Sequence, residues 1–375
     1  MKIGLLTYYG DLNCGTNLQA FATLSALRKV YSHDIVTIVP FHGFKPEIRP
    51  YKSFNPISIL HDIVRISKYR DFKRNYLEIV DSDPIIKDVN QALKYIASFN
   101  FDKIYIGADT LLELDRINND GLSAYWLKDI KSEKNLIAAS AKNLAYDNLT
   151  LRQRDDMNSA IMQFKYIGVR DRATAKLFSH FVSTSDIHYV PDPTFTLDID
   201  YSIINHYLEK KCVQIPSNSV FMHLYGDDEW ADELAKHLKL LGYYIITPRP
   251  YKYSDMVLND MGPLEQLGIY KYFDFVITHR FHDCVFSLKN NTPFFVYVKS
   301  KKVFMTQDKD SKHVSLLMDF GLYPDSFLGY VDDGISLSDI EEKIKKLKCK
   351  FDKEKISKKV EDLNKEYFNY LKSTI

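Results

Sequence analysis

A short polar run in the last third of the chain holds the residues with the clearest chemical potential. The apolar segment 275–277 leads into a helix-like stretch through five polar residues, Thr278, His279, Arg280, His282 and Asp283. In α/β folds, ligands bind where a parallel strand ends and the next helix begins. An arginine and a histidine at such a point can hold an anion and transfer a proton. Arg280 and His282 are therefore the leading site candidates; the alternative for His282 is a purely structural role.

A glycine-containing loop near the N-terminus is the second candidate. Residues 10–15 lie between an expected strand and a helix expected to open at Thr16 or Asn17. Backbone N–H groups at a helix start can bind an anion. The glycine spacing matches neither the dinucleotide fingerprint nor the P-loop, so it gives no support for NAD or ATP. The residues predicted to contact a ligand are Asn13, Gly15, Asn17 and Gln19. Alternatively, Gly15 is only a tight turn, Asn17 caps the helix and Gln19 lies on the surface.

Two more charged residues stand at expected strand ends. Asp109 follows a strand at 103–106, where a carboxylate could act as a base, and Arg170 ends a strand at 166–169. A strand-end arginine can bind a carboxylate or phosphate through two hydrogen bonds. The alternatives are that Asp109 caps the next helix and that Arg170 forms an ion pair with Asp171 or with a neighbouring helix.

Strands alternate with helices along both halves of the chain. In the first half, the expected strands cover 3–7, 35–39, 103–106, 135–139 and 166–169. In the second half, a helix is expected at 230–241 and strands at 220–225, 244–247, 275–277 and from Phe294. This alternation predicts parallel sheets with helices on both faces.

The chain is too long, at 375 residues, for one compact core, so we expect more than one domain. The expected domains are a lobe at 1–200 with an insertion at about 44–81, a second lobe at 201–335, and an amphipathic helix at 336–375. Two proline-containing turns open the insertion, and a basic and aromatic stretch at 66–76 comes after them. This stretch is either a solvated helix face or a weak contact for an anionic membrane leaflet.

The composition narrows the function classes. The 50 Lys and Arg nearly balance the 49 Asp and Glu, which argues against a dedicated nucleic-acid binder. Four cysteines without C-x-x-C spacing argue against zinc ribbons and disulfide scaffolds and for a reducing compartment. The sequence opens like a strand rather than a signal peptide, and no apolar run approaches the ~18 residues of a membrane span. We therefore expect a soluble, cytoplasmic protein.

Six stretches resemble, in order, motifs of the polysaccharide pyruvyl transferase family. Residues 278–286 are similar to the family signature Thr-x-[Ser/Arg]-[Phe/Leu]-His-x-x-x-Phe-Ser, and Thr-Pro-Phe stands at 292–294, after the signature, as it does in the family. The other matching stretches are 9–22, 101–109, 137–140, 167–171 and 190–193. The resemblance spans about residues 2–322, and its specificity comes from the shared order of the pieces.

Some positions depart from the family pattern. The family's Gly-Ser-Asp-Gln or glycine-rich form is Gly-Ala-Asp-Thr at 107–110, which keeps Asp109 and changes the residue after it. Lys312 or His313 stands where the family often has an arginine, and His279 stands where the family varies.

The resemblance implies two Rossmann-like lobes of the glycosyltransferase-B kind, with the active site in the cleft between them. It implies transfer of a pyruvyl group from phosphoenolpyruvate to two hydroxyls of a sugar in a surface polysaccharide, such as a capsule, or in its lipid-linked precursor. Arg170 and Arg280 would bind the donor, His282 would act as general acid, and Asp109 would act as base on the acceptor. This chemistry needs no metal or nicotinamide cofactor.

Two other functions stay open. A glycosyltransferase using a nucleotide sugar would have the same fold, with Arg280 on the diphosphate, although no glutamate is spaced to hold a ribose after Arg280. A divergent, non-catalytic protein of polysaccharide assembly is favoured by the altered segment 107–110. Whether phosphoenolpyruvate, UDP or GDP raises the melting temperature separates the three.

Overall fold

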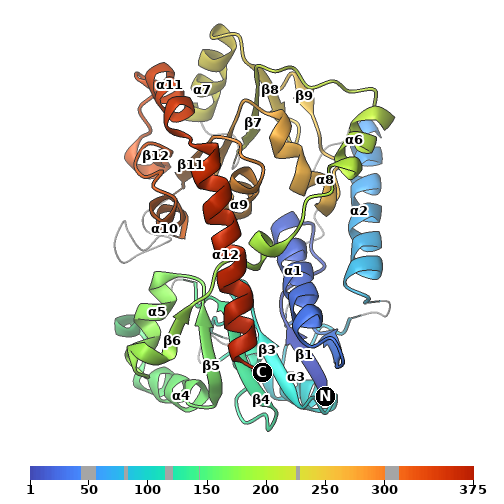
Figure 1. Cartoon of the computed structure of the whole chain (residues 1–375), viewed down its shortest axis with the longest axis vertical. Helices are drawn as coiled ribbons and strands as arrows, with labels where there is room; N and C mark the ends of the chain where they lie inside the picture. Colours follow the sequence, from blue (N-terminus) through green and yellow to red (C-terminus); the bar gives the residue numbers. More distant parts are fainter. Residues whose placement is uncertain (44–55, 80–82, 115–120, 143, 225–228, 300–311) are drawn as a thin grey trace. The chain divides into compact units, whose positions relative to one another are not determined.

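The computed structural model describes residues 1–43, 56–79, 83–114, 121–142, 144–224, 229–299 and 312–375 (Figure 1). The chain forms two compact units. The first unit contains Met1–Ile48, Arg70–Leu197 and Leu363–Ile375, and the second contains Arg49–Tyr69 and Asp198–Asp362. The proline-containing turns expected at the start of the insertion lie outside the described residues.

The first unit is built on a six-stranded parallel sheet in the order β2-β1-β3-β4-β5-β6. Its strands are β1 (Lys2–Leu6), β2 (Ile35–Ile38), β3 (Lys103–Ile106), β4 (Glu133–Ala139), β5 (Phe164–Val169) and β6 (Ile187–Tyr189). The five strands expected from the sequence are confirmed within two residues at each end. The short edge strand β6 was not predicted because two of its three residues, His188 and Tyr189, are exposed, so it has no apolar run.

Helices cover both faces of this sheet, as Figure 1 shows in blue to green. They include α1 (Cys14–Val30), α3 (Val89–Ala97), α4 (Leu151–Ile161) and α5 (Arg172–Phe178). All four residues of β3 are buried, as expected for a central parallel strand covered on both faces. The core of the unit contains Ile104, Trp126, Leu136 and Phe178, each 1% exposed or less.

The second unit repeats this plan, with a six-stranded parallel sheet in the order β12-β11-β10-β7-β8-β9. Its strands are β7 (Ser219–His223), β8 (Tyr244–Thr247), β9 (Met256–Val257), β10 (Phe275–Thr278), β11 (Phe294–Val298) and β12 (Phe327–Tyr330). Its helices include α6 (Tyr201–Lys210), α7 (Glu229–Leu240), α8 (Pro263–Gly268), α9 (Phe281–Lys289), α10 (Lys312–Asp319) and α11 (Ile340–Lys350). The predicted strand and helix pattern is confirmed, and β9 and β12 are additions at the sheet edges.

Two long helices, α2 (Pro56–Tyr76) and α12 (Lys353–Ser373), contribute residues to both units. The tail expected as one helix at 336–375 forms two, α11 and α12. They are separated because Phe351 is buried and the Asp352 carboxylate accepts a hydrogen bond from the Lys355 backbone, which caps α12. The end of α12 belongs to the first unit, where the Tyr370 hydroxyl donates to the Leu136 carbonyl at 2.6 Å.

Candidate functional sites at the strand ends

The start of α1 differs from its prediction. The helix begins at Cys14, and the Asn13 side chain caps it by accepting a hydrogen bond from the Gly15 N–H at 3.1 Å. The expected start at Thr16 or Asn17 was therefore wrong, and so was the alternative in which Asn17 is the cap. The anion-site hypothesis requires backbone N–H groups that can bind a ligand. The Gly15 N–H is already engaged, because it donates to the Asn13 side chain in the helix cap.

Asn17 is fully buried and holds the loop together. Its side-chain oxygen accepts from the Gly10 N–H at 3.1 Å, and its amide nitrogen donates to the Asp11 and Asn13 carbonyls, both at 2.8 Å. Each polar end of this side chain is thus engaged by the backbone. Asn17 fixes the path of the chain between β1 and α1.

Gln19 and Asp109 meet although they are 90 residues apart in sequence. The Gln19 side chain is fully buried, and its amide donates to one Asp109 carboxylate oxygen at 2.9 Å. The alternative that placed Gln19 on the surface was wrong. Asp109 has a φ of 85°, in the left-handed region that is unfavourable for a non-glycine residue. Its side chain remains 16% exposed, so solvent or a ligand can reach the carboxylate.

Asp109 does not cap a helix in the described residues that follow it directly. Residues 110–114, the described stretch directly after it, contain no helix. The carboxylate does accept a hydrogen bond from the adjacent Thr110 N–H at 2.8 Å, and the Asp109 carbonyl accepts one from the Ser140 N–H at 3.0 Å. These contacts and Gln19 hold Asp109 at the carboxyl edge of the first sheet.

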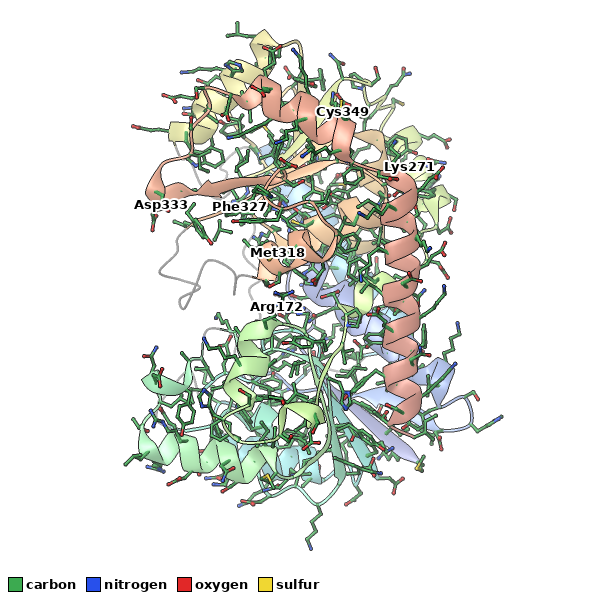
Figure 2. All side chains as sticks on the ribbon, turned by 60° about the vertical axis from the view of Figure 1, so that its left-hand side comes forward. Arg172, Lys271, Met318, Phe327, Asp333 and Cys349 are labelled. Atoms are coloured by element: carbon green, nitrogen blue, oxygen red, sulfur yellow. The ribbon has the colours of Figure 1, made fainter. Side chains whose placement is uncertain are left out.

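Arg170 is buried against two aspartates. One guanidinium nitrogen lies 2.8 Å from the Asp192 carboxylate and another 3.6 Å from that of Asp109, and the Arg170 side chain is 3% exposed. Burial disfavours the charged form, but Asp192 and Asp109 outweigh it, so the pKa of Arg170 lies above its usual value. The expected alternative partner, Asp171, instead caps α5 through the Thr174 N–H. The neighbouring Arg172 is exposed (Figure 2).

Asp192 was missed as a site residue. It is 1% exposed at the side chain, and its second oxygen accepts from the Thr194 N–H at 3.0 Å and from the Thr194 hydroxyl at 2.6 Å. The available signal was its position in the Pro-Asp-Pro segment 191–193, which lies in one of the stretches that carry the resemblance. The first unit therefore contains a connected set, Gln19–Asp109–Arg170–Asp192.

In the second unit, Asp283 is the centre of a buried network. Its carboxylate receives hydrogen bonds from the Thr278 hydroxyl at 2.8 Å and the Tyr270 hydroxyl at 2.8 Å, and lies 2.6 Å from His223 Nδ1. Burial raises the pKa of this carboxyl, but His223 and the two hydroxyls outweigh it and hold the pKa at about 2. Asp283 is therefore ionised at neutral pH.

Arg280 and His282 lie at the predicted strand-to-helix turn. Arg280 occupies the N-cap position of α9, its side chain is exposed, and its backbone N–H donates to the Thr278 hydroxyl at 2.9 Å. His282 is half-buried in the first turn of α9, with its ring 5.6 Å from that of Phe281 and 6.0 Å from that of Phe286. The predicted pair thus stands at the carboxyl edge of the second sheet.

Further cationic and imidazole groups lie near this edge. His223 ends β7, and Arg249, which comes after β8, donates to the Leu224 carbonyl at 2.8 Å. His279 lies beside His223; burial lowers the pKa of His279 to about 2, and the charge of Arg280 acts in the same direction. His223 and Arg249 stand at the carboxyl ends of strands, as Arg280 does. Their position in the sequence would therefore have made them site candidates too, but they were not predicted.

His313 does not replace the positive charge of the arginine that the family often has at this position. The side chain is buried, and its ring lies edge-on to that of Phe281 at a centroid distance of 5.9 Å. Burial, then the charge of Lys312, lowers the pKa of His313 to about 3, so the ring is neutral at neutral pH.

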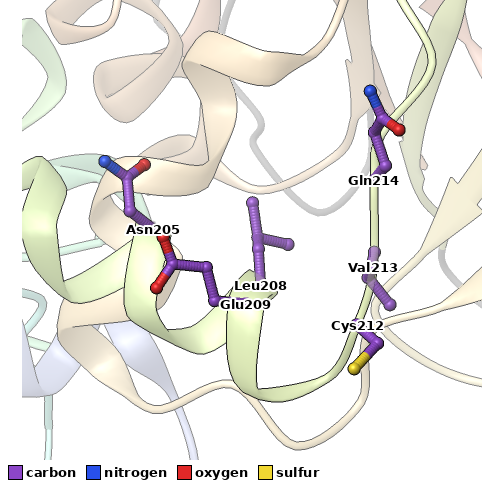
Figure 3. A pocket seen from close by; sticks show the side chains of 6 residues that line it. All are labelled: Asn205, Leu208, Glu209, Cys212, Val213 and Gln214. Carbon is purple, nitrogen blue, oxygen red and sulfur yellow. The ribbon is translucent and has the colours of Figure 1, made fainter.

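A shallow pocket of about 310 Å³ lies on α6 and the segment after it, away from the predicted site residues (Figure 3). It is lined by Asn205, Leu208, Glu209, Cys212, Val213 and Gln214. Within the described ranges, no group of three or more His, Cys, Asp and Glu side chains is placed to hold a metal ion. None of the helices that the structure describes is both long and apolar enough to span a membrane.

Two parallel Rossmann-like sheets with flanking helices define a fold of the glycosyltransferase-B type. The UDP-GlcNAc 2-epimerase of Methanocaldococcus jannaschii, solved with UDP-GlcNAc and UDP, is similar at a TM-score of 0.52 and 12% identity, over 98% of this chain and 94% of that one. A glycosyltransferase from Rickettsia africae ESF-5 is similar at a TM-score of 0.54 and 10% identity, over 100% and 96%. Identities this low establish the fold alone.

The family itself is established by the sequence match. The model of the family described as polysaccharide pyruvyl transferase matches residues 13–300. This match covers well over half of the chain, so the chain belongs to the polysaccharide pyruvyl transferase family. No curated protein matches it in sequence. The resemblance drawn from the motifs is thereby confirmed, and the protein is a transferase of polysaccharide modification.

Proposed function

We propose that this protein transfers a pyruvyl group from phosphoenolpyruvate to two hydroxyls of a sugar in a polysaccharide or its lipid-linked precursor. The product is a cyclic ketal, and inorganic phosphate is released. The observation that best supports this proposal is the exposed Arg280 beside His282 on the first turn of α9, in a member of this family. The reaction itself needs no metal or nicotinamide.

Arg280 is the proposed contact for the donor. Phosphoenolpyruvate carries a carboxylate and a phosphate, and a guanidinium binds either group through two parallel hydrogen bonds. The Arg280 side chain is exposed, whereas its backbone is fixed by the Thr278 hydroxyl. The N-terminal end of α9 adds a partial positive charge at the same place.

His282 and Asp109 are the proposed acid and base. Protonation of the donor methylene carbon by His282 makes the neighbouring carbon electrophilic, and a sugar hydroxyl oxygen then bonds to that carbon. Asp109 takes the proton of this hydroxyl. The carbon–oxygen bond to phosphate breaks, the second hydroxyl oxygen bonds to the same carbon and closes the ring, and the proton of this hydroxyl leaves with the phosphate. Gln19 and Arg170 orient the Asp109 carboxylate.

The test is direct assay with phosphoenolpyruvate and a panel of saccharides. We expect phosphate release only with a suitable acceptor, together with a product heavier by one pyruvyl ketal in mass spectrometry. We also expect phosphoenolpyruvate to raise the melting temperature. A rise with UDP or GDP and none with phosphoenolpyruvate would favour a nucleotide-sugar glycosyltransferase, and a rise with none of these ligands would favour a non-catalytic role.

Arg170 was expected to contact the donor, but its burial supports a role in positioning Asp109. An ammonium group cannot reproduce the two contacts to Asp192 and Asp109. We therefore expect Arg170→Lys to lower the free energy of unfolding, and Arg170→Ala to lower it by about 3 kcal/mol, because Asp192 is left buried without its counter-charge. Denaturant unfolding measures this, with Arg172→Lys, at the exposed neighbouring position, as the control.

The same variants separate the two roles of Arg170. In the positioning role, phosphoenolpyruvate affinity measured by calorimetry stays near that of the wild type while kcat falls. Weaker donor binding in Arg170→Lys at unchanged stability would assign this residue to the donor after all.

A weak contact with the cytoplasmic face of a membrane remains a proposal for α2. The structure narrows the predicted basic and aromatic surface, because Tyr69 and Phe72 are buried and Lys68 pairs with Glu265 at 2.8 Å. Arg70 and Arg74 stay exposed on the helix. The same helix exposes the apolar residues Ile59, Leu60 and Ile63.

The expected result is salt-sensitive co-sedimentation with anionic vesicles. Each basic residue near such a surface contributes about 1 kcal/mol, so replacing Arg70 and Arg74 by Glu should weaken binding by at least about 30-fold at low salt. The control is Lys353→Glu with Lys358→Glu, the same charge change at exposed positions of α12. Equal sedimentation of both double variants, or no sedimentation of the wild type, would rule out this contact.

A further inference from the structure

A histidine and an aspartate meet at the carboxyl edge of the second sheet. His223 is the last residue of β7, and it lies opposite Thr278, the last residue of the neighbouring strand β10. Asp283 lies in the first turn of α9, directly after β10, and one of its carboxylate oxygens is 2.6 Å from His223 Nδ1. Adjacent parallel strands thus bring together two residues that are 60 positions apart.

The hydrogen bonds around Asp283 define the tautomer of His223. An ionised carboxylate can only accept hydrogen bonds, and Asp283 also receives the Thr278 and Tyr270 hydroxyls. The short contact therefore requires the His223 proton on Nδ1. In a neutral imidazole this leaves the lone pair on Nε2.

The surroundings of His223 keep the ring neutral. Burial lowers its pKa below the usual 6.5, and this outweighs the opposing effect of Asp283, while Arg280 and Arg249 lower the pKa further. His279, the residue after β10, donates from Nδ1 to the His223 carbonyl at 2.9 Å if it carries its proton there, and the two rings meet edge-on at 5.5 Å. The His223 side chain is 12% exposed, so most of the ring is shielded from water but a substrate can still reach part of it.

The proposed reaction contains a step that needs such a base. Two hydroxyl protons leave the acceptor when the ketal forms. One proton is gained by the donor methylene carbon, and the other leaves with the phosphate. Asp109 was assigned to one hydroxyl, so no protein group has yet been assigned to carry the proton of the other hydroxyl to the phosphate.

We propose that His223 is a catalytic base, held by Asp283, that accepts the proton of one acceptor hydroxyl at Nε2. This inference rests on the proposed function. As the hydroxyl oxygen bonds to the donor's electrophilic carbon, its O–H bond breaks and the proton moves to Nε2. Asp283 stays ionised and stabilises the imidazolium that forms, as the aspartate of a Ser-His-Asp triad does. The proton then passes to the departing phosphate.

The first test compares His223→Gln and Asp283→Asn with the wild type in the pyruvyl transfer assay. Loss of a positioned base lowers rates about 10²- to 10⁴-fold, and we expect this fall in kcat with little change in KM. An asparagine amide can donate to Nδ1, which places the proton on Nε2 and removes the base. Asn290→Ala is the matched control, because it deletes two buried side-chain hydrogen bonds at the end of α9.

A purely structural pair would behave differently. In that case kcat would fall only as far as stability falls, and Asn290→Ala, at equal loss of melting temperature, would lose as much activity. That outcome would overturn the proposal. The pH profile adds a second criterion, because protonated His223 cannot accept a proton. The wild-type kcat/KM should fall on the acid side below pH 6.5, and His223→Gln should lack this limb.

Nuclear magnetic resonance of the wild type labelled with ¹⁵N-histidine tests the site without turnover. We expect His223 to be neutral, with the proton on Nδ1, and to keep this form down to a pH below the usual titration of histidine. An Nε2-protonated ring would overturn the role of His223 while leaving pyruvyl transfer intact. Absence of transfer by the wild type would instead refute the proposed function, and the base role with it.

Discussion

Replacing Arg280 or His282 by alanine lowers the rate of pyruvyl transfer about 30- to 1,000-fold, which corresponds to about 2–4 kcal/mol of lost transition-state stabilisation. The Arg280 variant would lack the charge-assisted contact to the donor. The His282 variant would lack the group that protonates the methylene carbon. The fold should persist, because the Arg280 side chain is exposed and His282 is only half-buried. Phosphate release measures the rate, and circular dichroism measures folding.

The control and a graded variant sharpen this result. Arg152→Ala removes an exposed arginine from α4 in the first unit and should leave the rate unchanged. Arg280→Lys keeps the charge but not the paired hydrogen bonds, so we expect an intermediate loss with a raised KM for phosphoenolpyruvate. Near-full activity in both alanine variants would show that the site lies elsewhere.

Asp109→Asn is expected to lower kcat about 10²- to 10⁴-fold, because the amide keeps the shape of the carboxylate but cannot accept a proton. The Gln19 amide and the Arg170 guanidinium hold the carboxylate in place. Gln19→Leu should therefore cost less than Asp109→Asn, since the base survives and only its orientation is loosened. Single-turnover kinetics at saturating phosphoenolpyruvate separates this chemical step from donor binding.

Asp147→Asn, at an exposed position, is the control for the same chemical change. If Asp109→Asn keeps wild-type kcat, the carboxylate serves only to neutralise Arg170. In that case a loss of stability would be the main effect, and the base for the acceptor would have to be sought among other residues.

Local pattern was sufficient to predict the strands that carry the site. Short apolar runs with helical spacing after them placed Asp109, Arg170, Arg280 and His282 at the carboxyl ends of strands, and the structure has each of them there. The reason is that strand and helix periodicities depend on neighbouring residues alone. Very short edge strands such as β6 and β9 carry too little of that pattern to be recognised.

The cap of α1 shows the limit of local pattern. Asn13 and Asn17 are both suitable capping residues. Asn13 forms the cap, whereas Asn17 is buried against the backbone of the loop. The choice depends on how the loop between β1 and α1 folds back, which the residue types do not specify.

The partners of the site residues depended on the tertiary structure. Gln19 reaches Asp109 because β1 and β3 are neighbours in the sheet, and Asp192 reaches Arg170 because β5 and β6 are neighbours. His223 reaches Asp283 because β7 lies beside β10.

By itself, the sequence determined which residues stand at strand ends and which family the chain resembles. The tertiary structure decided which of those residues are buried in pairs, as Arg170 is, and which remain exposed, as Arg280 does. The physical reason is that pairing and burial depend on the order of strands in each sheet. That order brings together segments that are tens of residues apart, so it cannot be predicted from the local pattern of residues.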